Sequence, residues 1–559
     1  MVKRIINLLN KEISGLHEAA YLLAVFTFAS QLLALIRDRS LASFFGAGET
    51  LDIYYASFRI PDFIFITIAS IVSISVLIPF LADKSRKEND EMQNFVDSVF
   101  TIFFSFIVLV SLIVFLFTPV ILAKMFPLFS VGALSQAISL TRVLLLGPIF
   151  LGLSNLFASI IQLNKKFLVY AISPLLYNLG IIFGIFFLYP SFGLIGLGWG
   201  VVLGAFMHLA VQIPVASSVG LLPKFTKRIN FVDIKKVTLL SLPRTLTMSA
   251  NQIALFFLVA IASSVGVGAI TVFSLSFNIQ SVPMSVIGVS YSVAAFPTLT
   301  RLFFAGERQK FLGQMISASR HIIFWSLPAL ALFVVLRAQI VRTILGTGQF
   351  DWSATRLTAA CLAMFAFSVA AQSLILLFIR GYYAMGNTRR PLFINIFSSA
   401  SIIVFAFIFS WLFKEFDIFK YFVEDMFRVE DLAGTNVLML AFSYSLGTIL
   451  NAVLLMIMFE KDFDKFIPSI SKTFWHSLFA SIIMGFVAYR FLDFFGKYFD
   501  LDTLAGIFAQ GFFAGIIGIF AGILTLSIMG NRELKEAKKA LSKKIWKVGG
   551  IVLPEKREL

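Results

Sequence analysis

The residues best suited to chemistry in this chain are charged and amide side chains that interrupt long apolar segments. Five of them fall in the first part of the chain: Arg37, Asp38, Asp52, Arg59 and Asp62. A charge inside a membrane is costly, so residues of this kind usually have a function. Since the arginine fork matches phosphate and carboxylate oxygens, arginines that face a cavity indicate an anionic substrate.

Six further candidates follow later in the chain: Arg142, Arg244, Asn251, Gln252, Asn278 and Gln280. An arginine can also extend its side chain to the lipid headgroups. We favour the cavity for Arg37 and Arg59, and both interpretations stay open for Arg142 and Arg244. Asn395 is interpreted as an amide that contacts a neighbouring helix, with cation coordination as the alternative.

The composition indicates which solvent surrounds these residues. The chain has 559 residues, of which 59% are hydrophobic and 14% are charged, and its mean hydropathy is +0.91. Soluble domains are about 25% charged, so water cannot surround most of this chain, and its hydrophobicity also excludes intrinsic disorder. Cys361 is the only cysteine and the four histidines lie far apart, so we predict neither a disulfide nor a metal site.

Segments of about 20 apolar residues are long enough to cross a bilayer, and fourteen occur in the sequence. They fall near residues 17–37, 52–82, 95–122, 133–162, 168–188, 193–218, 234–262, 268–304, 312–338, 354–384, 390–413, 433–459, 472–492 and 502–530. Lysine and arginine are concentrated in alternate connections and in the tail, which predicts that both termini are cytoplasmic. The net charge of +16 then reflects topology, and we expect no nucleic-acid binding. The sequence predicts an all-α polytopic membrane protein with about fourteen transmembrane helices.

A weak internal repeat divides the chain. The segment PLLYN, from Pro174 to Asn178, recurs as PLFIN, from Pro391 to Asn395, which suggests two pseudo-symmetric six-helix lobes followed by two helices. The predicted domains are an N-terminal lobe at 1–220, a C-terminal lobe at 221–460, a pair of helices at 461–530 and a basic cytoplasmic tail at 531–559. The tail is expected to be either a solvated helix end or an amphipathic helix on anionic lipid.

Signatures of an enzyme are weak. The chain has no G-x-x-x-x-G-K-[ST] phosphate-binding loop. Two D-x-D pairs, Asp462 with Asp464 and Asp500 with Asp502, fall in short loops with no catalytic domain around them. The connection 414–432 is expected to form a small surface helix on the outer face, and it carries no catalytic signal. We therefore expect a transporter and not an enzyme.

Three blocks of the sequence are distinctive. The first contains FFGAGETLD, FRIPD and VLIPFLA, the second begins NQIALFFLVAIASSVGVGAITVFSLSFNIQ, and the third contains GTGQFDWSAT and RGYYAMGNTRRP. In this order they resemble the MurJ (MviN) lipid II flippases, a family of the multidrug/oligosaccharidyl-lipid/polysaccharide (MOP) exporter superfamily. The resemblance implies fourteen helices, in two lobes of six plus two, with a groove for a lipid tail near 472–530.

The same resemblance implies a function. A protein of this family moves undecaprenyl-diphosphate-linked lipid II from the inner to the outer leaflet of the bacterial inner membrane, for peptidoglycan synthesis. A diphosphate cannot cross hydrocarbon unaided, so a cationic cavity would bind the head while the prenyl tail stays in lipid. Alternating access of the lobes would then carry the head across, driven by membrane potential or by a Na⁺ or H⁺ gradient. No other cofactor is expected, and the cell-wall synthesis machinery is a candidate partner.

The match of individual residues to the family is mixed. Four residues match charged family positions: Arg37, Asp38 and Asp52, which are functionally important there, and Arg59, which is basic there. Three family arginines are absent, and their positions hold Gln31, Phe65 and Asn278. Because fewer cations bind a diphosphate less strongly, Arg142 and Arg244 are candidates to compensate. Unchanged substrate affinity after Arg244→Ala would remove Arg244 from the site.

Several alternative functions stay open, because three arginines of the family are absent. The first is a flippase for another polyprenyl-linked glycan, such as an O-antigen or teichoic-acid unit. The second is an ion-coupled drug exporter of the same superfamily, which predicts more carboxylates than arginines in the cavity. A membrane glycosyltransferase or ligase would need a large outer domain or a metal site. A scaffold that transports nothing would be favoured by loss of all cavity cations, and Arg37 and Arg59 argue against it.

Overall fold

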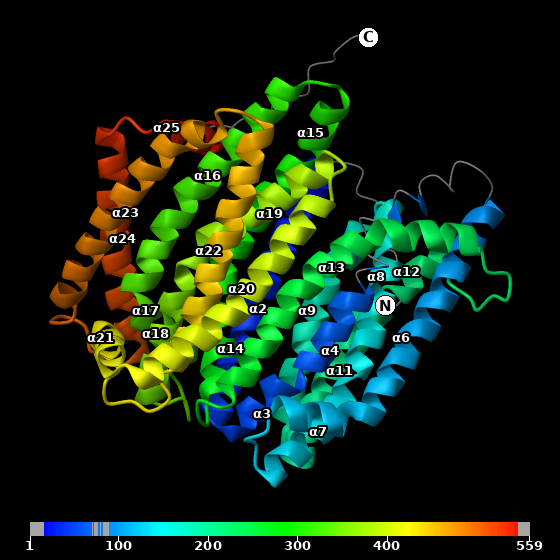
Figure 1. Ribbon diagram of the computed structural model, residues 1–559, viewed down its shortest axis with the longest axis horizontal. Coiled ribbons are helices and arrows are strands. Elements are labelled where there is room, and N and C mark those ends of the chain that lie inside the picture. The colour runs from blue at the N-terminus through cyan, green and yellow to red at the C-terminus, as the bar shows by residue number, and fades with distance from the viewer. Residues whose placement is uncertain (1–15, 70, 72–76, 79, 82–88, 546–559) are drawn as a thin grey trace. The chain divides into compact units, whose positions relative to one another are not determined.

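The computed structural model describes the whole chain except residues 1–15, 70, 72–76, 79, 82–88 and 546–559. The described residues form helices joined by short connections, and no strand occurs among them (Figure 1). Contacts divide the chain into two units. The first comprises 1–279, 344–361 and 388–447, and the second comprises 280–343, 362–387 and 448–559.

The helices of the first unit are α2 (Leu16–Phe45), α3 (Glu49–Ser57), α4 (Arg59–Ile64), η1 (Phe65–Ala69), α6 (Asn89–Met125), α7 (Val131–Leu144), α8 (Leu146–Leu163), α9 (Phe167–Phe183), η2 (Gly184–Leu188), α10 (Tyr189–Phe192), α11 (Leu194–Ala210), α12 (Ile213–Ser218), α13 (Phe231–Ala262), α20 (Arg389–Glu415) and α21 (Asp417–Phe427). Those of the second unit are η3 (Ser285–Val289), α15 (Ser290–Phe304), α16 (Arg308–Val335), α19 (Ser368–Ala384), α23 (Phe466–Phe495), α24 (Leu504–Ile528) and α25 (Arg532–Ile545). Four helices continue from one unit into the other: α14 (Ala269–Met284), α17 (Arg337–Leu345), α18 (Trp352–Ala366) and α22 (Val437–Asp462).

The prediction of a helical membrane protein is confirmed. Within the described part of the chain, eleven helices are long and apolar enough to cross a membrane, or twelve if the bent pair α18 and α19 counts as one span. The predicted number of fourteen is not confirmed, and the predicted segment 52–82 extends into residues outside the described ones. The division into lobes at 220 and 460 stays a prediction. The surface helix expected in 414–432 is present as α21.

Polar residues set the starts of several helices, because a side-chain oxygen can accept a hydrogen bond from a free N–H of the first turn. Ser130 accepts one from the Ala133 N–H at the start of α7, at 3.0 Å. Thr503 does the same for the Gly506 N–H at the start of α24, at 3.1 Å.

The two repeated Pro-x-x-x-Asn segments also share a local geometry, since each asparagine donates its Nδ2 to the carbonyl of the proline, at 3.1 Å in PLLYN and 2.7 Å in PLFIN.

Glycines let α9 with η2 approach α11 closely. A Cβ atom added at Gly184 would lie 2.6 Å from the Cα of Gly200, and one added at Gly180 would collide with the backbone of Gly204. Small residues in this pattern are the usual means of close helix contact in membranes, where dispersion and shape replace the hydrophobic effect. This packing holds α9, and with it the Tyr177 and Asn178 side chains, in a fixed position.

Gly200→Ala tests this contact. The new methyl group has no room, since it would meet the Gly184 backbone, so the helices must separate and we expect a loss of about 1–3 kcal/mol in stability. Thermal unfolding of the purified protein in detergent measures the change. Gly147→Ala is the matched control, because nothing lies within 4 Å of a Cβ at that position. Equal midpoints for the two variants would contradict the interpretation.

Candidate functional site

A break in the helix at the start of the predicted second span orients the charged residues. Pro61 has no N–H, and its ring would clash with the carbonyl of Ser57, four residues earlier. The helix is therefore interrupted at Phe58, so that α3 ends at Ser57 and α4 begins at Arg59. The interruption falls three residues before Pro61 because the clash acts on the preceding turn.

A cavity of about 400 Å³ lies in the first unit, beside this break. Six of the predicted site residues line it: Arg37, Asp38, Arg59, Asp62, Gln252 and Asn278. Aromatic and hydroxyl side chains complete the polar part of the wall: Tyr54, Tyr55, Tyr177 and Ser274. Residues from α2, α3, α4, α9, α13 and α14 thus meet at one place.

Arg37 is held by a network of polar contacts. Its Nε and Nη2 lie 2.9 and 2.8 Å from Oδ1 of Asp38, and its Nη1 donates to Oδ1 of Asn178 at 3.1 Å. Asn278 donates its Nδ2 to the other Asp38 oxygen at 3.1 Å. Asp38 is only 3% exposed, so its charge needs these partners. The network fixes the Arg37 fork at the cavity wall.

Arg59 makes fewer hydrogen bonds than Arg37. Its Nη2 donates to Oγ of Ser274 at 3.2 Å, whereas its buried Nε has no hydrogen-bond partner among the described residues. The buried hydroxyl of Tyr55 also lacks one. A buried polar group without a partner costs about 1–3 kcal/mol, so an oxygen-bearing ligand would gain by satisfying both.

The formal charges of the cavity cancel when two arginines face two ionised aspartates. The Asp62 carboxylate, unlike the Asp38 carboxylate, accepts no hydrogen bond from a described residue. An anionic ligand would therefore meet Arg59 as its least neutralised partner, and would be repelled by Asp62 unless this carboxylate takes up a proton or a cation.

Asp52, a predicted site residue, lies outside the cavity. It accepts hydrogen bonds from the Gly268 N–H at 2.6 Å, the Thr271 N–H at 2.8 Å and the Thr271 hydroxyl at 2.7 Å. The carboxylate thus caps the N-terminus of α14, where the helix dipole favours a negative charge. Gly268 has φ +86°, and a Cβ there would collide with the Ala47 carbonyl, so only glycine fits this close approach.

The remaining predicted residues also lie away from the cavity wall. Arg142 has its guanidinium 4.7 Å from the Phe115 ring centre and donates to the Phe115 carbonyl at 3.3 Å. Asn251 is exposed on α13, and Arg244, on the same helix, is half-buried. In the second unit, the buried Gln280 accepts a hydrogen bond from Nε2 of Gln372 at 3.0 Å.

Some cavity residues were not predicted from the sequence. Tyr55, Arg59 and Asp62 are spaced at i, i+4 and i+7, which is one helix face, so the helical period could have identified Tyr55. Asn178, which contacts Arg37 but does not line the cavity, stood out in the repeat, and nothing in the sequence indicated this contact. Tyr177 gave no signal, since it belongs to an apolar helix far away in the sequence.

Comparison with protein families then identifies the chain. The model of the family "Lipid II flippase MurJ" matches residues 41–509. The chain belongs to the MurJ family. Its likeness to "Lipid II flippase MurJ" of Burkholderia cenocepacia is 25% identity over 392 residues, which cover 68% of this chain and 76% of that protein. A MurJ relative of Borreliella burgdorferi is 24% identical over 523 residues, covering 92% and 96%.

Solved structures show the same fold. A structure of the lipid II flippase MurJ in an inward closed conformation superposes with a TM-score of 0.72 at 22% identity, covering 91% of this chain and 98% of that one. An inward-facing multidrug MATE transporter of the MOP superfamily gives a TM-score of 0.61 at 16% identity, covering 79% and 96%. The expected MurJ family and MOP-type fold are confirmed. At two positions where the resemblance to MurJ expected arginine, Phe65 and Asn278 form part of the cavity wall.

Proposed function

We propose that this chain is a flippase that moves lipid II from the inner to the outer leaflet. Its membership of the MurJ family supports the assignment. The observation that carries it is the cavity with Arg37 and Arg59 in its wall, because the buried Nε of Arg59 can donate a hydrogen bond to a phosphate oxygen. Bacterial inner-membrane location with both termini in the cytoplasm completes the proposal.

The cavity would act on the head of the substrate. Arg59 and Tyr55 would bind one phosphate, and Arg37 would bind the other through the edge of its fork that Asp38 leaves open. The prenyl tail would stay in lipid while the lobes alternate in access. Asp62 is the group through which a proton or Na⁺ would neutralise the cavity as the diphosphate enters, and the membrane potential would favour transfer in one direction.

The test is flipping of fluorescent lipid II in proteoliposomes that contain the full chain. We expect lipid II to reach the opposite leaflet faster than in protein-free vesicles, and faster than polyprenyl-linked O-antigen or teichoic-acid units in parallel samples. Folded protein that flips only another glycan would overturn the proposal. Gln31, Phe65 and Asn278 would then explain the changed substrate.

A further inference from the structure

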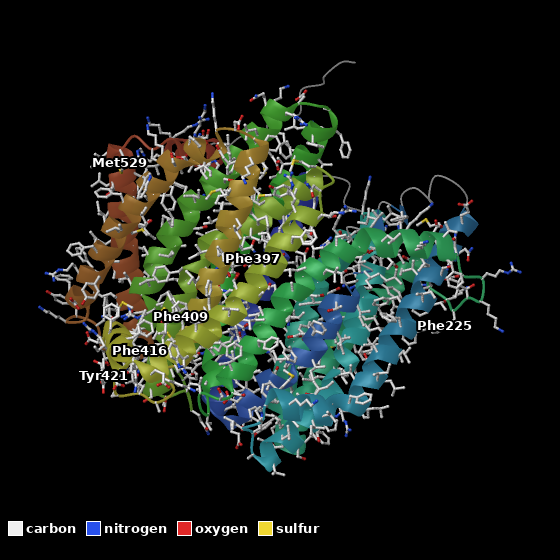
Figure 2. All side chains as sticks on the ribbon, viewed as in Figure 1. Phe225, Phe397, Phe409, Phe416, Tyr421 and Met529 are labelled. Carbon is white, nitrogen blue, oxygen red and sulfur yellow. The ribbon has the colours of Figure 1, made fainter. Side chains whose placement is uncertain are left out.

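A second group of basic residues lies at one end of the second unit, where α16, α23 and α25 meet. A cavity of about 160 Å³ there is lined by Arg320, Lys472, His476 and Arg532 together with Glu533. A neighbouring hollow of about 310 Å³ shares Arg320 and Arg532. Figure 1 shows α25 lying across the ends of α23 and α24, and Met529, labelled in Figure 2, marks the end of α24.

The carboxylate in this cavity is already engaged by the protein. Glu533 is 3% exposed and accepts a hydrogen bond from the Thr473 hydroxyl at 2.8 Å. Its Oε1 also lies 4.0 Å from Nε of Arg320. Arg320 is fixed in place, because Nε and Nη2 both donate to the Ser469 carbonyl at 2.9 and 2.6 Å. A rigid cation therefore forms the inner wall of the cavity.

Two other basic side chains in the cavity wall are not held by the protein in this way. Lys472 and His476 are one turn apart on α23, and the side chain of neither makes a hydrogen bond or ion pair with a described residue. Arg532 is also paired with Glu536, whose Oε1 lies 2.8 Å from its Nε. The three permanent cations Arg320, Lys472 and Arg532 still outnumber the carboxylates Glu533 and Glu536 by one, so the wall has a positive excess even with a neutral histidine. Such a cavity suits a phosphate group better than any neutral headgroup.

The surface of α23 below Lys472 is apolar and exposed. Trp475, Phe479, Ile482 and Phe486 follow at intervals of three or four residues, so they share one face of the helix, and each is at least half exposed. The neighbouring α24 presents its own exposed apolar row, which is formed by Phe520, Leu524 and Ile528. Tryptophan is typical of the membrane–water interface. The cations thus lie at the depth where apolar lipid contact ends.

We propose that this cavity binds the phosphate of an anionic glycerophospholipid whose acyl chains lie along the exposed rows of α23 and α24. Charge selects the occupant, since a zwitterionic lipid brings a cation that the positive wall repels. The site lies in the second unit and is separate from the cavity around Arg37, so it does not depend on the proposed flippase activity. On the predicted topology, the lipid would belong to the cytoplasmic leaflet.

Native mass spectrometry of the full chain in detergent tests the proposal. Phosphatidylglycerol and phosphatidylcholine are added in equal amounts, and the retained adducts of each lipid are counted. We expect the wild type to retain phosphatidylglycerol preferentially, and the double variant Lys472→Gln, Arg532→Gln to reduce that preference roughly tenfold, since two cations near the lipid phosphate are lost. Phosphatidylglycerol should also raise the thermal midpoint of the wild type, whereas phosphatidylcholine should not.

The matched control is the double variant Lys497→Gln, Lys535→Gln. It removes the same charge, and both lysines are exposed and outside the two hollows. An equal loss in this control would show that net charge alone attracts the lipid, which overturns the site. Displacement of the lipid by an equal concentration of soluble glycerol 3-phosphate would also overturn it, because the acyl chains would then contribute nothing.

Discussion

Arg37→Ala is expected to reduce lipid II flipping in proteoliposomes roughly 10- to 100-fold. Each hydrogen bond to a charged group contributes about 1.5–3 kcal/mol, and Arg37 is one of the two arginines that line the cavity among the described residues. Its loss also leaves the buried Asp38 carboxylate without its cation, so the cavity becomes net negative and repels a diphosphate. The initial flipping rate, measured against lipid II concentration, separates weaker binding from slower transfer.

The chain offers a matched control for this variant. Arg142→Ala removes the same charge, but Arg142 contacts Phe115 and does not line the cavity. It should flip lipid II at close to the wild-type rate. Arg37→Lys keeps the charge and loses the fork, so it should fall between the two. If Arg142→Ala loses as much activity as Arg37→Ala, then the cavity is not the diphosphate site.

The helical membrane fold could be predicted from composition and segment length alone. The number of spans could not, because short breaks such as the one at Phe58 leave apolar composition unchanged while they divide a helix. The loop helix α21 was predictable because charged residues interrupt the apolar pattern there. The close contact between Gly184 and Gly200 was not, since a glycine in a membrane helix does not indicate its partner.

The charged residues of the candidate site could be predicted from the sequence, because a charged side chain in an apolar segment indicates a buried charge. Arg37, Asp38, Arg59 and Asp62 were found because few side chains of their kind occur in apolar segments. The same reasoning placed Asp52 with them. Sequence cannot show whether a buried carboxylate faces a cavity or backbone N–H groups, and only the contacts with Gly268 and Thr271 separate the two.

Asp52→Asn is expected to open the end of the first unit at which α3 and α14 begin. The carboxylate accepts three hydrogen bonds there, and an amide has only one oxygen to accept them while its NH₂ faces N–H donors. Losing one charge-assisted bond costs about 1.5–3 kcal/mol. The arrangement in which α3 is bonded to the start of α14 should therefore lose population roughly 10- to 100-fold relative to one in which the two have separated.

Thiol accessibility measures this opening. In a Cys361→Ala background, Ser274→Cys places the only thiol in the cavity wall, because Cys361 is the single cysteine of the chain. A membrane-impermeant thiol reagent, added on the side where α3 and α14 begin, should react at least about tenfold faster in the Asp52→Asn variant.

Glu49→Gln is the control that distinguishes the loss of the Asp52 hydrogen bonds from a general effect of charge on α3. Glu49 precedes Asp52 by one helical turn and carries the same charge, but it is exposed and its only hydrogen bond among the described residues is with the Ser130 hydroxyl. Removing its charge should leave the labelling rate unchanged. Equal acceleration by both variants would mean that the negative charge of α3, and not its bonds to α14, keeps this end closed. We expect the bonds to dominate, because they join α3 directly to the start of α14, whereas the hydrogen bond of Glu49 is to Ser130.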